Sequence, residues 1–260
     1  MRHGVDPLAE KYPAISPFTY VFNNPIRLVD PNGMETEGDI YNNKGVHIGN
    51  DGVMDNKAYF LNTNSDKFLT TKESKSVIKS GSAALLGITN SELNLRSFLS
   101  ALRSTENLPQ SSPLGYNSQY GGGGPGGVFT QNTYEECPEA YCQHPLMNSS
   151  INGGTPAGAY QFTRKTWNKE LVGRFGLNSD FVPENQDKGA SLLIPSKAKD
   201  YLSSNNLNGA LNLTNNLWSS LPGGRHSKID FKGFFKIFNE YRRNEMFGIS
   251  IIATPVGKLK

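Results

Sequence analysis

The chain has 260 residues, of which 36% are hydrophobic, and a net charge of +3 at pH 7. A chain of this length can bury a sizeable core as one large domain or two small ones. The mild positive charge falls well short of the basic footprint of a nucleic-acid-binding protein. No stretch approaches the roughly 20 apolar residues of a membrane span, and the start, MRHGVDPLAEKYP, lacks the apolar run of a signal peptide.

Residues 1–34 are dense in proline, asparagine and aromatic residues, with turn signals every few positions and no helical period. The segment ends in PIRLVDPNGM (25–34), and it resembles the end of the Rhs-repeat-associated core, which precedes the variable tip of polymorphic toxins. The resemblance implies cleavage by the core's own protease activity near Met34 and Glu35. By its shape alone, DPNG (30–33) is a tight turn, which does not explain the longer match.

Residues 35–90 contain three short segments with the composition of strands, DIYNN (39–43), VHIG (46–49) and AYFLN (58–62), joined by turn sequences. The polar stretch 72–86 has the character of a helix. No chemical motif stands out, so we expect a linker or small adaptor here.

The stretch LRSFLSALRSTE (95–106) predicts an amphipathic helix, with the N-cap among residues 89–91. Its apolar stripe is formed by Leu95, Phe98, Leu99 and Leu102. The next position on the stripe is occupied by Glu106, just before the proline that ends the helix. The sequence therefore directs a carboxylate toward the protein interior, or bends it back to water at the helix end.

Residues 107–157 are glycine-rich and predict an irregular β lobe rather than a helix. The segment holds both cysteines of the chain, Cys137 and Cys142. A local disulfide, formed in an oxidising compartment, and two unlinked thiols both stay open. A metal site that also uses His144 would lack a fourth ligand.

Helical spacing returns in the last hundred residues. We expect a helix from about Tyr160, another over residues 207–218, and a third over residues 231–241 with Asp230 as its N-cap. The apolar stripes of the last two helices, with Trp218 among their members, are best explained by core packing.

The order of these parts resembles the lysozyme-like superfamily, and most closely the lambda-type phage endolysins, which are lytic transglycosylases. Seven landmarks occur in order. They are FLSALRSTE (98–106), Gly115-Tyr116-Asn117, Phe129 ahead of His144-Pro145, PAGAYQF (156–162), Trp167, FGLNSDFVPENQD (175–187) and LWSSLPGG (217–224).

The resemblance implies an α+β fold, mainly helical with a small Gly-rich β lobe, over residues 91–248, followed by a tail at 249–260. It implies that the enzyme cuts the glycan strands of peptidoglycan, that it needs no metal or cofactor, and that Glu106 is catalytic. It also implies that substrate is bound by Tyr116, Gly158, Tyr160 and Gln161.

The proposed chemistry explains a carboxylate on a core-facing stripe. Burial penalises the charged form and raises the pKa of a carboxyl group, so that it can donate a proton near neutral pH. Glycosidases that use two carboxylates need a second one at a defined separation, and Glu135, Glu136 and Glu139 belong to no motif. A lytic transglycosylase works with one carboxylate, which acts first as acid and then as base.

Three departures from the endolysins stand out. Residues 105–108 read Thr-Glu-Asn-Leu instead of Ser-Glu-Gly-Thr around the acid, Ala159 replaces an arginine, and Arg-His-Ser (225–227) replaces Tyr-Gly-Gln. A hydrolytic muramidase, a non-catalytic glycan-binding module and a structural cap of an Rhs shell therefore stay open as alternatives. The Rhs resemblance further implies export by a dedicated secretion system, action in the periplasm or cell wall of a target bacterium, and an immunity protein as partner.

Overall fold

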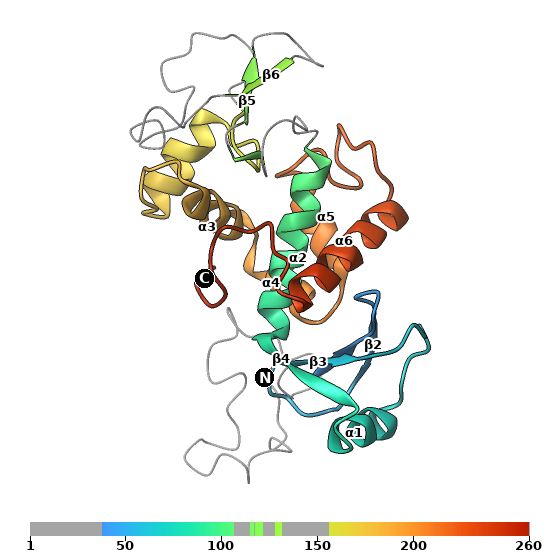
Figure 1. The fold of residues 1–260 in the computed structure, drawn as a ribbon. Coiled ribbons are helices and arrows are strands. Elements are labelled where there is room, and N and C mark those ends of the chain that lie inside the picture. Colours follow the sequence, from blue (N-terminus) through green and yellow to red (C-terminus); the bar gives the residue numbers. More distant parts are fainter. Residues whose placement is uncertain (1–37, 107–114, 117, 122–127, 132–155, 260) are drawn as a thin grey trace, which may run out of the picture.

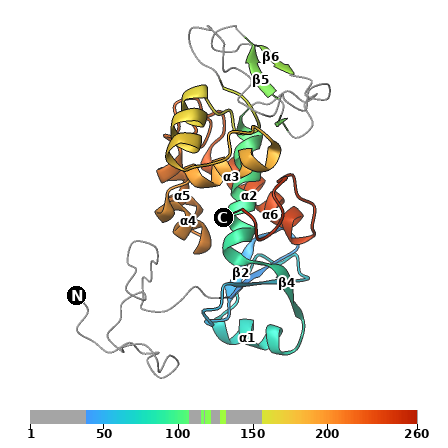
Figure 2. The same cartoon turned by 90° about the vertical axis from the view of Figure 1, so that its left-hand side faces the viewer.

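The computed structural model describes residues 38–106, 115–116, 118–121, 128–131 and 156–259. Within these residues the fold is α+β, as the sequence predicts, with a helical body standing beside a small mixed sheet (Figures 1 and 2). The predicted cleavage boundary at Met34 and Glu35 and the pair Cys137 and Cys142 lie outside the described residues.

The sheet is formed by β1 (Asp39–Tyr41), β2 (His47–Asn50), β3 (Lys57–Leu61) and β4 (Ala83–Thr89), in the order β2-β1-β3-β4. β1 and β3 are parallel, whereas the other neighbours are antiparallel. Three of these strands match the predicted segments to within two residues. One face of the sheet is covered by a helix, and the buried residues between them form a small core of their own (Ile40, Ile48, Tyr59 and Ala83).

The single helix expected over residues 72–86 is wrong in its second half. Helix α1 (Thr71–Lys79) begins at a capping box between Thr70 and Glu73 and ends before Gly81, whose φ of +76° turns the chain. The following residues form strand β4, because their backbone pairs with β3. Long-range pairing overrides the local helical pattern here.

Helix α2 (Asn90–Thr105) is the axis of the helical body (Figures 1 and 2). The side chain of Thr89 caps it by accepting a hydrogen bond from the Glu92 N–H. Phe98, Leu99 and Leu102 are completely buried, as the stripe predicts. Helices α3 (Pro183–Leu193), α4 (Ser196–Ser203) and α6 (Phe231–Met246) all pack against α2.

The helix expected from Tyr160 begins later than predicted. Ala157 and Phe162 form an isolated β-bridge instead, because Gly158 and Gln161 take left-handed φ values of +75° and +50° that no helix accommodates. A helical segment follows, most of which is the π-helix η6 (Thr166–Arg174). Strands β5 (Ser118–Gly121) and β6 (Val128–Gln131) form a hairpin in the Gly-rich region, where a β lobe is predicted.

The two C-terminal aromatic patterns are partly confirmed. α5 (Leu207–Thr214) ends four residues earlier than the predicted helix over 207–218. Trp218, in the segment that follows, is buried as predicted, whereas Leu217 is 48% exposed. Asp230 caps α6 as predicted. On α6, Phe234 and Phe238 are buried, whereas the rings of Phe231 and Phe235 are 39% and 47% exposed, contrary to a single buried stripe.

Residues 249–259 follow α6 without regular structure, but they are not a loose tail. Ile252, Thr254 and Leu259 are buried against the helical body. The guanidinium of Arg96 on α2 donates hydrogen bonds to the Thr254 carbonyl and the Ser250 hydroxyl. Among the described helices, none is long and apolar enough to cross a membrane.

Candidate active site

Glu106 is the C-cap residue of α2, and its backbone N–H donates to the Arg103 carbonyl at 3.2 Å. Its side chain is half-buried, and Oε1 accepts a hydrogen bond from Ser220 Oγ at 2.5 Å. Ser220 Oγ is also 2.9 Å from Thr105 Oγ1, so Ser220 contacts two consecutive residues at the end of α2. Within the described part of the chain, Oε2 has no hydrogen-bond partner.

Burial raises the pKa of Glu106 to about 7, and the hydrogen bond from Ser220 opposes this shift. No charged side chain among the described residues contributes to the shift. The carboxyl group therefore holds its proton close to neutral pH for a simple physical reason, which is desolvation without a compensating cation. A proton donor of this kind is what general acid catalysis of glycosidic cleavage requires.

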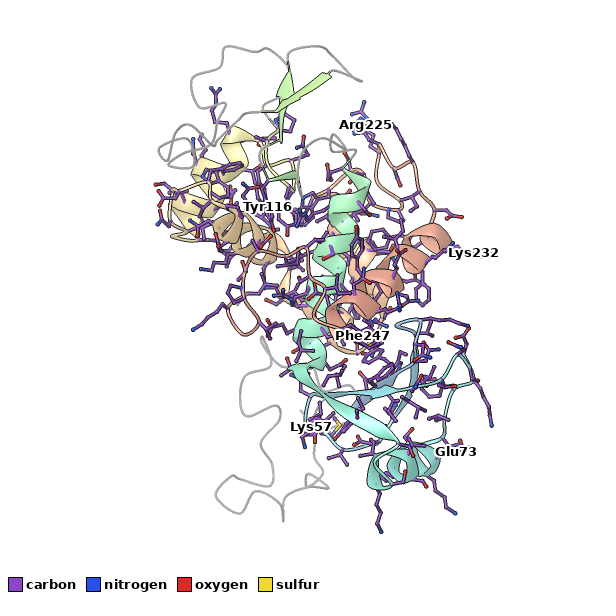
Figure 3. All side chains as sticks on the ribbon, viewed as in Figure 1. Lys57, Glu73, Tyr116, Arg225, Lys232 and Phe247 are labelled. Carbon is purple, nitrogen blue, oxygen red and sulfur yellow. The ribbon has the colours of Figure 1, made fainter. Side chains whose placement is uncertain are left out.

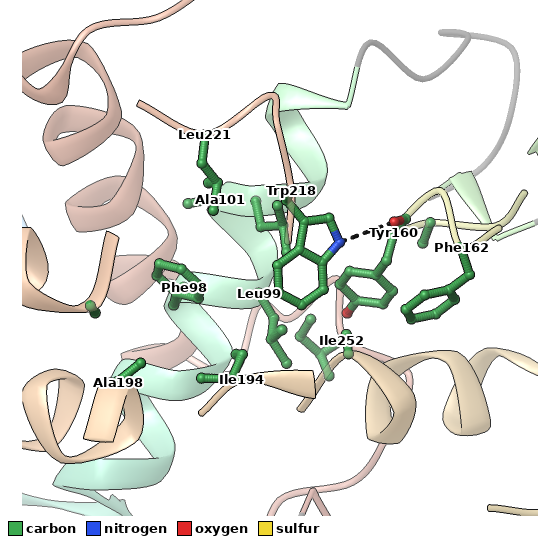
Figure 4. Close-up of a cluster of buried hydrophobic side chains, with 14 of the residues drawn as sticks. Phe98, Leu99, Ala101, Tyr160, Phe162, Ile194, Ala198, Trp218, Leu221 and Ile252 are labelled. Carbon is green, nitrogen blue, oxygen red and sulfur yellow. Dashed lines mark hydrogen bonds between the residues drawn. The ribbon is translucent and has the colours of Figure 1, made fainter. Parts of the chain in front are cut away.

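The loop that carries Ser220 is anchored by Trp218. The indole is 5% exposed, and its Nε1 donates to the Tyr160 carbonyl at 3.2 Å (Figure 4). Two predicted parts of the site, the end of α2 and the Gly-x-Tyr-Gln turn, are thereby joined through the segment 217–221.

The turn at residues 157–162 depends on Gly158. Besides its positive φ, a Cβ at this position would lie 2.2 Å from Gln186 Oε1. Gln186 is completely buried and uses its whole amide, since Oε1 accepts from the Ala159 N–H and Nε2 donates to two carbonyl oxygens. Gln161 folds back on the turn, and its Nε2 donates to the Gly158 carbonyl at 2.8 Å. Its Oε1 has no hydrogen-bond partner among the described residues.

The side chains of Tyr116 and of Tyr160, which belongs to this turn, are buried in the core. Both hydroxyl groups donate to Asp187 Oδ1 at 2.7 Å, and burial raises the pKa of both phenols. The guanidinium of Arg103 lies over the Tyr116 ring at 4.3 Å. These contacts fix the positions of both tyrosine side chains in the core. That the two tyrosines bind substrate stays a prediction.

Three residues that support the site were not predicted individually. Asp187 accepts hydrogen bonds from both tyrosines and from Thr254, Gln186 holds the turn, and Ser220 touches Glu106. All lie inside sequence landmarks, but nothing in their spacing indicates which partners they meet. In the described part of the chain, no three histidine, cysteine or acidic side chains gather as metal ligands would.

Comparison with known proteins places this geometry in context. A family model described as "Endolysin" matches residues 96–244, which include Glu106, the turn at 157–162 and Ser220. None of the curated proteins matches the chain. Among solved structures, bacteriophage lambda lysozyme complexed with a chitohexasaccharide is 23% identical, with a TM-score of 0.44, over 58% of this chain and 94% of that one.

Proposed function

Since the chain belongs to the endolysin family, it is a lysozyme-like enzyme that degrades peptidoglycan, and we propose that it does so with Glu106 as its acid. The proposed target is the β-1,4 bond between N-acetylmuramic acid and N-acetylglucosamine. The observation that carries the proposal is the half-buried Glu106 carboxyl, whose pKa burial raises to about 7 and which accepts a hydrogen bond from Ser220.

The proposed reaction is that of a lytic transglycosylase. Glu106 donates its proton to the leaving glycosidic oxygen as the bond to the muramic acid C1 breaks. The resulting carboxylate then takes the proton from the muramic acid 6-hydroxyl, whose oxygen bonds to C1 and closes a 1,6-anhydro ring. Glu106 returns to its protonated form, so the cycle needs no water and no second carboxylate.

Analysis of the reaction products tests this mechanism. Mass spectrometry of digested glycan strands should show 1,6-anhydro ends. Reducing ends would instead make the enzyme a muramidase that transfers the sugar to water. Undigested strands would favour a glycan-binding module or a structural cap of an Rhs shell.

We further propose that the enzyme is the toxic tip of an Rhs-type polymorphic toxin. The support is the resemblance of the sequence PIRLVDPNGM (25–34) and the residues before it to an Rhs core boundary. In this role residues 35–260 would be released near Met34 and Glu35, exported by a dedicated secretion system, and active in the periplasm or cell wall of a target bacterium. A producer would then need an immunity protein.

Directed expression tests this role. Residues 35–260 fused to a periplasmic signal should lyse cells, whereas the same residues kept in the cytoplasm should not. Equal toxicity in both compartments would contradict a peptidoglycan target. A disulfide between Cys137 and Cys142 would form only after export and would contribute at most a few kcal/mol.

A further inference from the structure

The loop after Ser220 is held in one conformation beside Glu106. The His226 N–H donates to the Ser219 carbonyl at 2.9 Å, and His226 Nδ1 lies 2.9 Å from Ser219 Oγ. Gly223 turns the chain with a φ of +82°. The Gly224 N–H also donates to the Leu221 carbonyl at 2.8 Å, so the backbone on both sides of Arg225 is held against the segment that carries Ser220.

Arg225 begins a row of exposed cations, which we call the cationic surface and which consists of Arg225, Lys228, Lys232 and Lys236. Figure 3 shows Arg225 on the loop near the end of α2 and Lys232 on the outer side of α6. The two lysines of α6 are four residues apart and so share one helix face. In the described part of the chain, none of the four cations has an ion-pair partner.

Local electrostatics does not account for these charges. Two acidic residues are nearest in sequence: Asp230 is used as the N-cap of α6, where Oδ1 accepts from the Gly233 N–H at 2.7 Å, and Glu240 forms no ion pair with Lys236 in the described part of the chain. The first turn of α6 contains no acidic side chain but does contain Lys232, at the helix end where a positive charge is unfavourable. An external anion would relieve this repulsion.

We propose that the cationic surface binds the carboxylates of the stem peptides on a glycan strand that occupies the Glu106 site. This inference rests on the proposed function, because peptidoglycan is a glycan whose muramic acid units carry short peptides ending in free carboxylates. The guanidinium of Arg225 matches a carboxylate in geometry as well as charge. The exposed rings of Phe231 and Phe235 supply apolar contact on the same helix.

A binding measurement tests the proposal without requiring cleavage. In a Glu106→Gln background, the dissociation constants of fluorescent glycan strands are measured with and without stem peptides. The test variant carries Arg225→Gln, Lys228→Gln and Lys232→Gln. The control carries Lys72→Gln, Lys75→Gln and Lys79→Gln, which remove the same charge from the exposed face of α1 at the far end of the molecule.

The test variant should bind stem-bearing strands about tenfold more weakly, with the stripped strands and the control unchanged. The difference should shrink as salt is added. An equal loss on both strands, or no loss on either, would overturn the proposal. So would unchanged strand binding with lost binding to anionic phosphatidylglycerol vesicles, which would make the surface a membrane contact. Failure of the parent enzyme to cut either strand would count against the proposed function. The binding measurement would still decide whether the cationic surface recognises stem peptides, because it does not require cleavage.

Discussion

A carboxylate lies at each end of α2: Asp39 of β1 at the N-terminal end and Glu106 at the C-terminal end. The two differ in the number of hydrogen bonds that they accept from the described residues. At the N-terminal end, Asp39 Oδ2 accepts hydrogen bonds from Asn90 at 2.5 Å and Asn205 at 2.7 Å. His47 Nε2 lies 2.8 Å from Asp39 Oδ1, within ion-pair range. At the C-terminal end, the Glu106 carboxylate accepts a single hydrogen bond from the described residues, and its donor is Ser220.

We expect the number of hydrogen-bond partners to separate a structural carboxylate from one that exchanges protons, as we propose for Glu106. Asp39 joins the sheet to the helical body, since Asn90 belongs to α2 and Asn205 follows α4. Asp187 is similarly engaged by two tyrosines and Thr254. Donors that surround a carboxylate stabilise its charge and its position, whereas burial with few donors leaves it ready to exchange a proton.

The largest expected effect is the loss of activity in Glu106→Gln. Glutamine keeps the shape of the side chain but cannot donate a proton, so peptidoglycan cleavage should fall by about a hundredfold or more. Release of soluble glycan fragments measures it. Glu240→Gln on the exposed side of α6 is the matched control and should retain full activity. Residual activity above a tenth of the parent would remove Glu106 from the role of acid.

At the N-terminal end of α2 we expect a mutation to lower stability. Asp39→Ala leaves buried amide groups without an acceptor and should lower the free energy of unfolding by about 2–4 kcal/mol. Urea denaturation measures this loss. Glu170→Ala removes an exposed ion pair with Arg174 and should cost less than about 1 kcal/mol. Equal losses in the two variants would mean that partner number does not identify the structural carboxylate.

Local pattern was sufficient to predict that Glu106 lies at the C-terminal end of α2, but it did not predict the contacts of Asp39 at the N-terminal end. The stripe of Phe98, Leu99 and Leu102 places Glu106 on the core side of a helix from spacing alone. The partners of Asp39 come from Asn90 and Asn205, which are far away in sequence and carry no periodic signal.

The same limit explains the wrong boundaries. Strand β4 exists because β3 pairs with it, and the turn at 157–162 exists because Gln186 and Trp218 hold its backbone. On α6, helical spacing identifies the aromatic residues, but it cannot tell that Phe231 and Phe235 stay at the surface. Contacts across the fold decide these points.

The dependence of folding stability on pH offers a further test of whether Glu106 differs from Asp39. The folded-state pKa of Glu106 is raised from 4.5 to about 7, so the folded protein binds this proton more tightly than the unfolded chain does. The parent should therefore lose stability as pH rises from about 4.5 to 7, and Glu106→Gln should not. Because the side chain is half-buried, we expect the variant to gain about 1–2 kcal/mol above pH 7 and nothing below pH 4.5.

Urea denaturation at pH 4.5, 6 and 8 measures this difference. A variant that is less stable than the parent at pH 8 would show that Glu106 is a structural carboxylate like Asp39.

Two glutamines extend the comparison to neutral groups. Gln186 has every amide atom engaged, whereas Gln161 leaves Oε1 without a partner among the described residues. Gln161→Ala should lower turnover about fivefold with an unchanged urea midpoint, because the free amide oxygen is available to a substrate. Gln186→Ala should instead lower the urea midpoint. Unchanged kinetics in Gln161→Ala would assign the turn to packing alone.

The smallest expected effect concerns the hydrogen bond that the Glu106 carboxylate accepts from Ser220. Ser220 Oγ donates to the carboxylate, which stabilises the charged form and lowers the pKa of Glu106. The parent's kcat/KM should fall as pH rises through about 7, because the acid loses its proton there. In Ser220→Ala this descending limb should move to higher pH, since burial then acts on Glu106 unopposed. Ser219→Ala removes a neighbouring hydroxyl that contacts His226 instead, and its profile should match the parent. A limb that moves to lower pH in Ser220→Ala would show that Ser220 does not stabilise the Glu106 carboxylate, and the end of α2 would need another donor.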